Sequence, residues 1–345
     1  MSVGGSTALT GLRVAAVILA ATAFIWIASG WLEAAAQRLS VYYGLPPVVQ
    51  GSVVVAIGSS FPEFASVLAA AFAGVFEMGV GAIVGSAIFN ILVIPAMAGL
   101  ATDEPLESNR TIVYKEAHFY MIAVAALVVT FSLAVIYLPA AAGPPLTGTL
   151  TRPLVSIPLL LYCLYLFIQW QDVSEYESLP EDVRIDVARE WAKLAAGLLV
   201  IVVAVERLVV AVETLGTAVG LPAFLGGVTI VAAATSLPDT LVSVRSARAQ
   251  RAATSLGNVL GSNTFDLLVV IPVGVLLVGS VPVDFATAVP MLGVLTLATV
   301  LLFTTLRTEL TLTRRESYLL LLGYALFVAW VVAETVGATD VLRSV

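Results

Sequence analysis

Long apolar runs recur through this 345-residue chain, and they restrict its possible folds more than any other feature. Runs of roughly 20 residues, the length of a helix that crosses a lipid bilayer, follow one another along the whole sequence. The runs are continuous and do not alternate with polar residues, which excludes a porin-type β-barrel. With 60% hydrophobic and 11% charged residues, the composition is also not that of a soluble domain. The sequence therefore predicts an all-α polytopic membrane protein.

Ten membrane-spanning segments can be placed in the sequence. They lie near residues 12–36, 46–72, 78–100, 115–138, 152–170, 189–213, 221–244, 253–279, 284–305 and 316–336. The first apolar run is too long for the core of a signal peptide, so we interpret it as a retained span. A polar segment separates five spans from five. We therefore expect a first membrane repeat at 1–170, a linker at 171–188 and a second membrane repeat at 189–345.

The distribution of Lys and Arg predicts the orientation, because these residues accumulate on the cytoplasmic side. If the N-terminus is outside, the inner loops and the adjoining span ends hold Arg38, Arg110, Lys115, Arg184, Arg189, Lys193, Arg245, Arg248, Arg251, Arg307, Arg314 and Arg315. The outer segments hold only Arg13, Arg152 and Arg343. We therefore expect a plasma-membrane protein with both termini outside the cell and a cytoplasmic linker.

The linker is acidic and carries much of the chain's net charge of −7. Such a charge indicates no nucleic-acid surface. We interpret the segment as a solvated connection between the two halves, with a regulatory calcium site as the alternative. Its carboxylates are Asp172, Glu175, Glu177, Glu181, Asp182 and Asp186.

The two halves of the chain repeat each other at an offset of 176 residues, the interval from Ser60 to Ser236. This offset crosses five spans, an odd number, so the two copies must enter the membrane from opposite sides. Inverted repeats of this kind place a substrate site near the middle of the membrane and permit alternating access. At this offset Gly44-Leu45-Pro46 matches Gly220-Leu221-Pro222, Pro62 matches Pro238, Glu63 matches Asp239, Gly85-Ser86 matches Gly261-Ser262, Phe89 matches Phe265, and Asn90 matches Asp266.

Each copy carries two polar motifs inside apolar spans. The first is Ser59-Ser60-Phe61-Pro62-Glu63 and its echo Thr235-Ser236-Leu237-Pro238-Asp239. A charge at bilayer depth is costly and marks a cavity or an ion path. A proline there interrupts the helix and frees backbone carbonyls, which we expect around Ala56 and Ala232, and such backbone is tolerated only where it lines a cavity.

The second motif, Gly85-Ser86 with Asn90 or Gly261-Ser262 with Asp266, adds further oxygens one helical turn apart. The candidate ligands are almost entirely oxygen, without thiolate or imidazole, and oxygen sites suit hard cations such as calcium and magnesium. Three carboxylates suit a divalent ion or several monovalent ones. The candidate metal-site residues are Ser59, Ser60, Glu63, Ser86, Asn90, Thr235, Ser236, Asp239, Ser262 and Asp266.

These motifs resemble the alpha-1 and alpha-2 repeats of the cation/calcium exchanger superfamily, which carry G-[ST]-S-x-P-[ED] followed by G-S-x-x-F-[ND]. The resemblance covers residues 44–95 and 220–271 closely. It implies broken helices that cross at the centre of the membrane, and antiport of calcium against sodium. It also implies that Glu63 and Asp239 are shared by both ions, and that Ser59 and Thr235 add calcium oxygens. By the same resemblance Ser60, Ser86, Ser236 and Ser262 would line sodium sites, and Asn90 and Asp266 would complete the centre.

Two departures from the family pattern leave alternatives open. The pair Asp239 and Asp266 is similar to that of the potassium-dependent sodium/calcium exchangers, so potassium is a possible additional ion. Ala87 stands where the family often has asparagine, whereas Asn263 keeps it in the second copy. Magnesium/sodium exchange, calcium/proton exchange and a passive cation channel are the alternative functions. We expect no enzyme activity, no cofactor beyond the transported ions, and no obligate protein partner, since no nucleophile–base pair or phosphate-binding loop is evident.

Overall fold

The computed structural model describes residues 3–46, 49–140, 146–175, 185–219, 223–335 and 337–339. The matched tripeptide Gly220-Leu221-Pro222 and the centre of the acidic linker, 176–184, lie outside the described residues. The first half consists of α1 (Val3–Tyr42), η1 (Gln50–Val55), α3 (Ala56–Ser59), α4 (Phe61–Ala73), α5 (Phe76–Leu92), α6 (Ile94–Leu100), β1 (Leu106–Glu107), η2 (Ile112–Ala117), α7 (His118–Tyr137), β2 (Thr147–Thr151) and α8 (Arg152–Glu175). The segments labelled η are π-helical turns.

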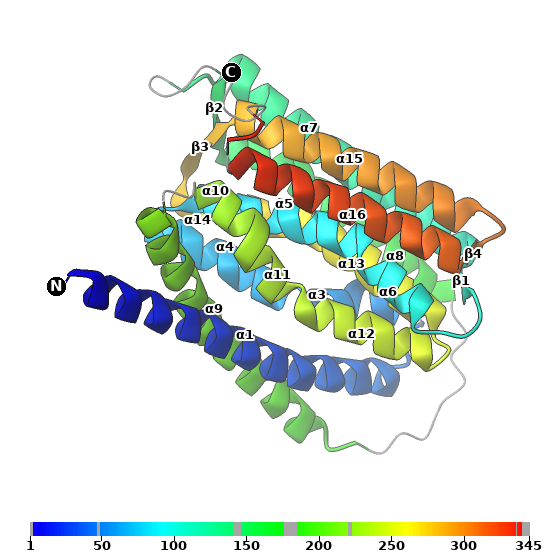
Figure 1. The fold of residues 1–345 in the computed structure, drawn as a ribbon. Coiled ribbons are helices and arrows are strands. Elements are labelled where there is room, and N and C mark those ends of the chain that lie inside the picture. Colours follow the sequence, from blue (N-terminus) through cyan, green and yellow to red (C-terminus); the bar gives the residue numbers. More distant parts are fainter. Residues whose placement is uncertain are drawn as a thin grey trace.

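The second half has a similar order of elements, with the π-helical turns partly at other positions. It consists of α9 (Val187–Val219), α10 (Ala223–Gly226), η3 (Gly227–Val231), α11 (Ala232–Thr235), α12 (Leu237–Arg248), α13 (Ala252–Phe265), η4 (Asp266–Val270), α14 (Ile271–Val278), β3 (Ser280–Asp284), α15 (Phe285–Arg307), β4 (Thr311–Leu312) and α16 (Arg314–Thr335). Figure 1 shows the long helices running roughly side by side, with α5 and α13 enclosed by the others.

The predicted fold class, an all-α membrane protein with about ten spans, is confirmed. Among the described residues, eight helices are long and apolar enough to cross a membrane. Two further spans are bent pairs, Gln50–Ser59 with Phe61–Ala73 at 41° and Gly227–Thr235 with Leu237–Arg248 at 45°. The first helix, α1, begins before and ends after the predicted limits of 12–36.

The two bends lie at the predicted positions, at Ser60 and Ser236. Each second half-helix carries its proline within the first two positions, where the missing N–H costs no helical hydrogen bond. The prediction about freed carbonyls is wrong at the two residues named. The carbonyl of Ala56 accepts the Ser60 N–H at 2.9 Å, and that of Ala232 accepts the Ser236 N–H at 3.0 Å, because the helix continues to the residue at the bend.

Equivalent glycines join the two repeats where their broken spans cross. A Cβ atom at Gly85 of α5 would collide with the carbonyl oxygen of Val228 in η3, and one at Gly261 of α13 would collide with that of Ser52 in η1. These two contacts are related by the 176-residue offset. Backbones of membrane helices approach this closely only where the side chains are small. Each broken span is therefore packed against the motif-bearing helix of the other repeat.

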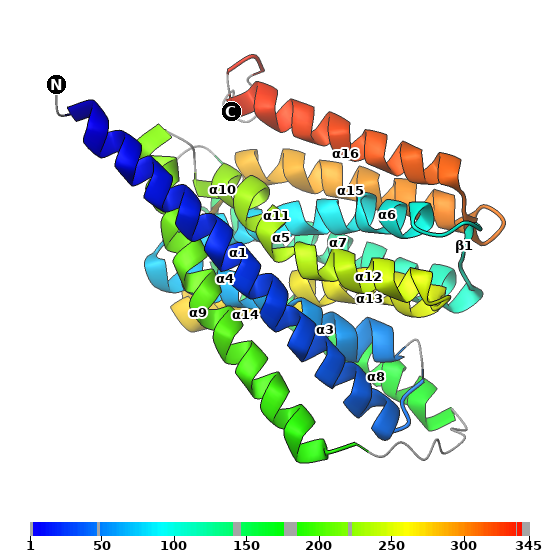
Figure 2. The ribbon, with the colours of Figure 1, turned by 60° about the horizontal axis from the view of Figure 1, so that its bottom comes forward.

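The remaining helices enclose this crossing. One core cluster extends from α5 and α13 to α7, α15 and α16, and a second joins α1, α4 and α9. Figure 2 shows α1 and α9 lying side by side along one flank of the bundle, where they contact each other. The core is mainly apolar, and many of its buried polar side chains lie at the crossing.

Two short antiparallel sheets, which the sequence patterns did not predict, join loops of the two repeats. β2 pairs with β3, with Thr147 opposite Asp284 and Thr151 opposite Ser280, and β1 pairs with β4. The sheets lie at opposite ends of the bundle (Figure 1). α1 begins and α16 ends at the end that carries β2 and β3.

Candidate ion-binding site

All ten predicted site residues lie at the crossing, and none exposes more than 1% of its surface. They come from both sides of the two bends, from α5 and α13, and from the first turn of η4. The chain places them there because each polar motif occupies a helix that packs, through glycine, on the other repeat. The site is therefore closed to both membrane faces in this conformation.

One cluster of contacts centres on Ser86. Its hydroxyl donates to Glu63 Oε1 at 3.2 Å and accepts a hydrogen bond from the Ser236 hydroxyl at 2.9 Å. Ser86 and Glu63 belong to the first repeat and Ser236 to the second. The oxygens of the two repeats are thus interleaved here.

A second cluster centres on Asp239. Asn90 donates one amide proton to Asp239 Oδ2 at 3.0 Å and its amide also lies 3.1 Å from Asn263 Oδ1. The Ser262 hydroxyl lies 3.5 Å from Asp239 Oδ1 and 3.4 Å from the Ser59 hydroxyl. Both carboxylate oxygens of Asp239 therefore face hydrogen-bond donors.

Several buried acceptors in the site have no hydrogen-bond partner among the described residues. They are Glu63 Oε2, Asn90 Oδ1 and both carboxylate oxygens of Asp266, together with the Ser60 hydroxyl, which lies near Asp266 without a close hydrogen bond to it. Burying an unpaired acceptor costs about 1–3 kcal/mol, and more for a charged group. Glu63 also lies close enough to Asp239 and Asp266 for their charges to repel one another. Oxygens left bare in this way fit a cation and do not fit an anion.

The carboxylates do not form a compact metal cage by themselves. Within the described part of the chain, no three His, Cys, Asp or Glu side chains converge closely enough to hold a metal ion. Hydroxyl and amide oxygens lie between the acids. A cation in this site would therefore be shared between charged and neutral oxygens, which suits ions that must also be released.

One predicted ligand is engaged elsewhere. The Thr235 hydroxyl donates to the carbonyl of Val231 at 3.1 Å within its own helix, a common arrangement for threonine in membrane helices. Its first-repeat counterpart Ser59 also lies 3.2 Å from a carbonyl of its own helix, that of Ala56, but its shorter contact is to Asn258 Oδ1 at 3.0 Å across the repeat interface.

Sequence reasoning missed Asn258 and gave no contact for Asn263. Both are fully buried on α13, and Asn258 also donates to the Ser243 hydroxyl at 3.3 Å. The amide of Asn263 donates to the carbonyl of Ala87 at 3.1 Å. The sequence did offer a signal for both residues, namely an amide side chain within an apolar span. Asn258 also lies one helical turn before the predicted ligand Ser262.

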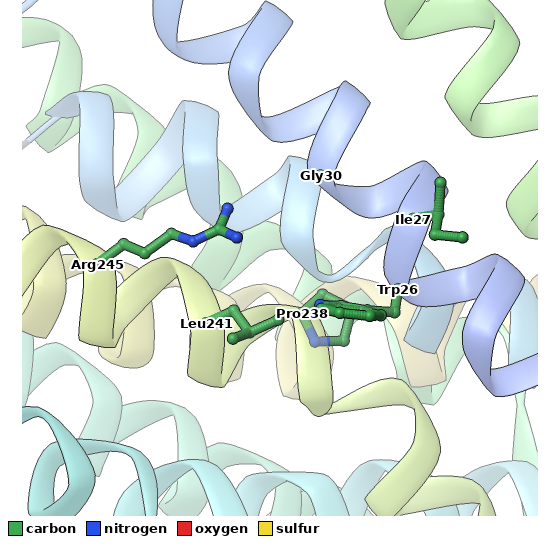
Figure 3. A pocket seen from close by; sticks show the side chains of 6 residues that line it. All are labelled: Trp26, Ile27, Gly30, Pro238, Leu241 and Arg245. Carbon is green, nitrogen blue, oxygen red and sulfur yellow. The ribbon is translucent and has the colours of Figure 1, made fainter.

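A groove of about 170 Å³ lies between α1 and α12, beside the second bend (Figure 3). It is lined by Trp26, Ile27, Gly30, Pro238, Leu241 and Arg245. Arg245 reaches toward it from α12, and Trp26 of α1 and Pro238 of α12 both line it. Its lining is apolar apart from one cation, so the groove is unsuited to binding a metal ion.

The acidic linker is described only at its two ends. Asp172 pairs with Lys115, and Asp186 accepts the Arg189 backbone N–H at 3.1 Å. The carboxylates of Glu177, Glu181 and Asp182 lie outside the described residues. The alternative of a regulatory calcium site in this segment stays a prediction.

Comparison with known proteins agrees with this geometry. The family model for the sodium/calcium exchanger protein matches residues 13–171 and 190–333. The chain is 28% identical over 281 residues to the putative antiporter CaxA of Alkalimonas amylolytica, covering 79% of this chain and 82% of that protein. It is 28% identical over 250 residues to the inner membrane protein YrbG of Escherichia coli, covering 69% and 71%.

A shorter similarity and a solved structure extend the comparison. Human sodium/potassium/calcium exchanger 2 is 33% identical over 88 residues, which is 26% of this chain and 13% of that protein. The sodium-calcium exchanger NCX_Mj, soaked with sodium and strontium, has the same fold with a TM-score of 0.65 at 21% identity, over 93% of this chain and 98% of that one. The chain thus belongs to the sodium/calcium exchanger family, whose members are multi-pass membrane transporters that exchange cations.

Proposed function

We propose that this protein is a secondary-active sodium/calcium antiporter in which sodium entry drives calcium out of the cell. The observation that carries the proposal is the set of buried oxygens without hydrogen-bond partners on Ser60, Glu63, Asn90 and Asp266. Hard cations are the ligands that satisfy such acceptors and offset the repulsion between the acids.

Coupling would arise because the two ions need the same oxygens. Glu63 and Asp239 face the site from opposite repeats, so an ion held between them excludes a competing ion of the other kind. Ser59, Ser86, Ser236 and Ser262 lie between or beside the acids. Hinge motion at the two bends would then expose the loaded site to one membrane face at a time.

The test is calcium uptake into proteoliposomes that contain sodium, diluted into sodium-free buffer. We expect the natural protein to take up calcium only with the sodium gradient, and Glu63→Gln to reduce the rate by more than about 100-fold, as expected when a buried ligand charge is removed. The control is Ser66→Ala, since Ser66 is equally buried one turn away but bonds only to the Glu63 carbonyl. Sodium-independent uptake would indicate a channel, and uptake by the Glu63→Gln variant would contradict the proposal.

The same assay separates the alternative ions. If magnesium competes with calcium for sodium-driven uptake, the protein is a magnesium/sodium exchanger. If a proton gradient drives calcium uptake in place of the sodium gradient, it is a calcium/proton exchanger. Potassium has specific support, because Asp266 is bare and rat sodium/potassium/calcium exchanger 3 is 35% identical over 98 residues, 28% of this chain. If potassium is co-transported, its removal will slow calcium uptake by the natural protein.

A further inference from the structure

A buried polar network lies outside the ion site, between η2 and α8. Glu116, which is 1% exposed, accepts hydrogen bonds from the Tyr165 hydroxyl at 2.7 Å and from the Gln169 amide at 2.8 Å. Lys115 lies 3.3 Å from Glu116 Oε1 and also pairs with Asp172 near the surface. Tyr165, Gln169 and Asp172 follow one another along one face of α8.

Tyr165 connects this network to the first broken span. Its hydroxyl lies 3.3 Å from the carbonyl oxygen of Ser52, within the π-helical segment η1. The same carbonyl lies against Gly261, where a Cβ atom would collide with it. The neighbouring Val53 packs on the cluster that contains Tyr165. η1 is therefore held by α13 through backbone contact and by α8 through one tyrosine.

The second repeat lacks the corresponding group. At the 176-residue offset, Val228 matches Ser52 and Leu292 stands where the first repeat has Glu116. Leu292 is 2% exposed and belongs to the apolar core. The backbone contact through glycine is thus common to both repeats, whereas the carboxylate exists only in the first. The two membrane faces are not equivalent.

We propose that Glu116 and Tyr165 are positioning residues that hold η1 in the closed arrangement and so set how readily the site opens to the membrane face where α7 begins. The Tyr165 hydroxyl has one proton, and the shorter contact, at 2.7 Å, donates it to Glu116. This bond holds the Tyr165 side chain against η1, with its oxygen 3.3 Å from the Ser52 carbonyl oxygen and Val53 packed on the same cluster. The proposal rests on the proposed function, since it concerns access to that same site.

The proposal predicts opposite effects at the two faces. Loss of one buried hydrogen bond shifts a two-state equilibrium by about 3- to 10-fold. If the Tyr165–Glu116 hydrogen bond stabilises closure at the α7 face, its removal increases the population open there and decreases the population open at the other face. The apparent affinity for calcium follows those populations. A variant that only weakens the fold would lower the amount of active protein and leave both half-saturating concentrations unchanged.

The test compares Tyr165→Phe with Tyr162→Phe in vesicles of defined sidedness. Tyr162 is the matched control because it lies one turn away, is 7% exposed, and has a hydroxyl without a hydrogen-bond partner in the described structure. We expect Tyr165→Phe to lower the half-saturating calcium concentration at the α7 face about 3- to 10-fold and to raise it at the opposite face. Tyr162→Phe should change neither value.

Substitutions at Glu116 provide a second comparison. Glu116→Leu removes the acceptor and should reproduce Tyr165→Phe. Glu116→Gln keeps an oxygen that accepts the hydrogen bond from Tyr165. Its half-saturating calcium concentrations at the two faces should therefore stay within about 2-fold of those of the natural protein. Equal changes at both faces, or unchanged values in Tyr165→Phe, would overturn the proposal.

Hydrogen exchange gives a readout that does not depend on transport. The η1 amides should exchange at least about 3-fold faster in Tyr165→Phe than in Tyr162→Phe, because local opening is easier. If the natural protein fails to move calcium but this difference is found, the proposed function fails and the positioning role stands. If transport is as proposed and exchange in η1 is unchanged, the positioning role fails alone.

Discussion

Asn90 and Asp266 occupy equivalent positions in the two repeats, yet one is a hydrogen-bond donor to a neighbouring acid and the other is an acid without a hydrogen-bond partner. The Asn90 amide donates to Asp239 and so supplies the positive end of a dipole to that acid. Asp266 cannot donate in this way when ionised, and both of its oxygens remain bare. Both oxygens of Asp239 therefore have donors within the protein, whereas Glu63 Oε2 and both oxygens of Asp266 have none among the described residues.

A substitution at Asp266 tests this asymmetry. Asp266→Asn should raise the free energy of unfolding of the protein measured without calcium by about 1–3 kcal/mol, because it removes a buried carboxylate that has no hydrogen-bond partner and that repels Glu63. It should also remove most of the stabilisation that calcium provides. Thermal unfolding with and without calcium measures both effects.

Thr264→Val is the control for that measurement. Thr264 is buried two residues away but bonds only to the Leu260 carbonyl of its own helix, at 2.7 Å. We expect the calcium-induced stabilisation to persist in this variant. A full calcium effect in Asp266→Asn would show that Asp266 does not face the bound ion.

At the scale of elements, the close crossing of broken spans and glycine-bearing helices holds the site together. Gly85 meets the backbone of η3 and Gly261 meets that of η1, so each motif helix supports the half-helix of the other repeat. A larger residue at either position must push the half-helix away. Such a displacement would move the site oxygens of both repeats together.

Gly85→Ala should therefore lower the free energy of unfolding by about 1–3 kcal/mol and impair ion binding, since the added methyl overlaps backbone that cannot rotate away. Gly293→Ala on α15 is the matched control, because a Cβ atom there meets nothing within 4 Å. That control should be neutral or stabilising by up to about 1 kcal/mol. Unfolding in detergent measures the change in stability of each variant, and a calcium-binding titration measures its calcium affinity. If Gly85→Ala and Gly293→Ala changed these two quantities equally, the close contact at Gly85 would be contradicted.

Much at this scale was predictable because it depends on local chemistry. Apolar run length located the spans, and Pro62 and Pro238 located the bends. Other features depend on the partner that a residue meets across the fold. The sequence alone could not show that Thr235 would bond to its own helix while Ser59 reached Asn258. Nor could short strands such as β1 and β4 be recognised, since their pairing joins loops about 200 residues apart.

At the scale of the whole molecule, the two repeats make one transporter with unlike faces. The start of α1 and the end of α16 lie at the end of the bundle that carries β2 and β3 (Figure 1). The segments with Arg110 and Arg314 adjoin β1 and β4 at the opposite end. By the distribution of positive charge, we expect the β1–β4 face to be cytoplasmic. The Glu116 network lies on that same side, at the end of η2, just before α7 begins.

Cysteine labelling tests this orientation. In a Cys163→Ala background, Glu104→Cys and Ser280→Cys each place one thiol at an exposed position near β1 or in β3. A membrane-impermeant maleimide should label the Ser280→Cys variant on intact cells, and the Glu104→Cys variant only after lysis. The reverse pattern would mean that the termini are cytoplasmic.

The central claim is that acids from both repeats form one shared cation site, and calcium binding at equilibrium tests it most directly. Titration calorimetry of the purified natural protein, Glu63→Gln, Asp239→Asn and the double variant measures both affinity and stoichiometry. We predict that each single substitution abolishes calcium binding, that the double variant is no worse, and that sodium competes with calcium in the natural protein. If each single variant instead kept a fraction of the bound calcium at unchanged affinity, the acids would serve separate sites and the account would be contradicted.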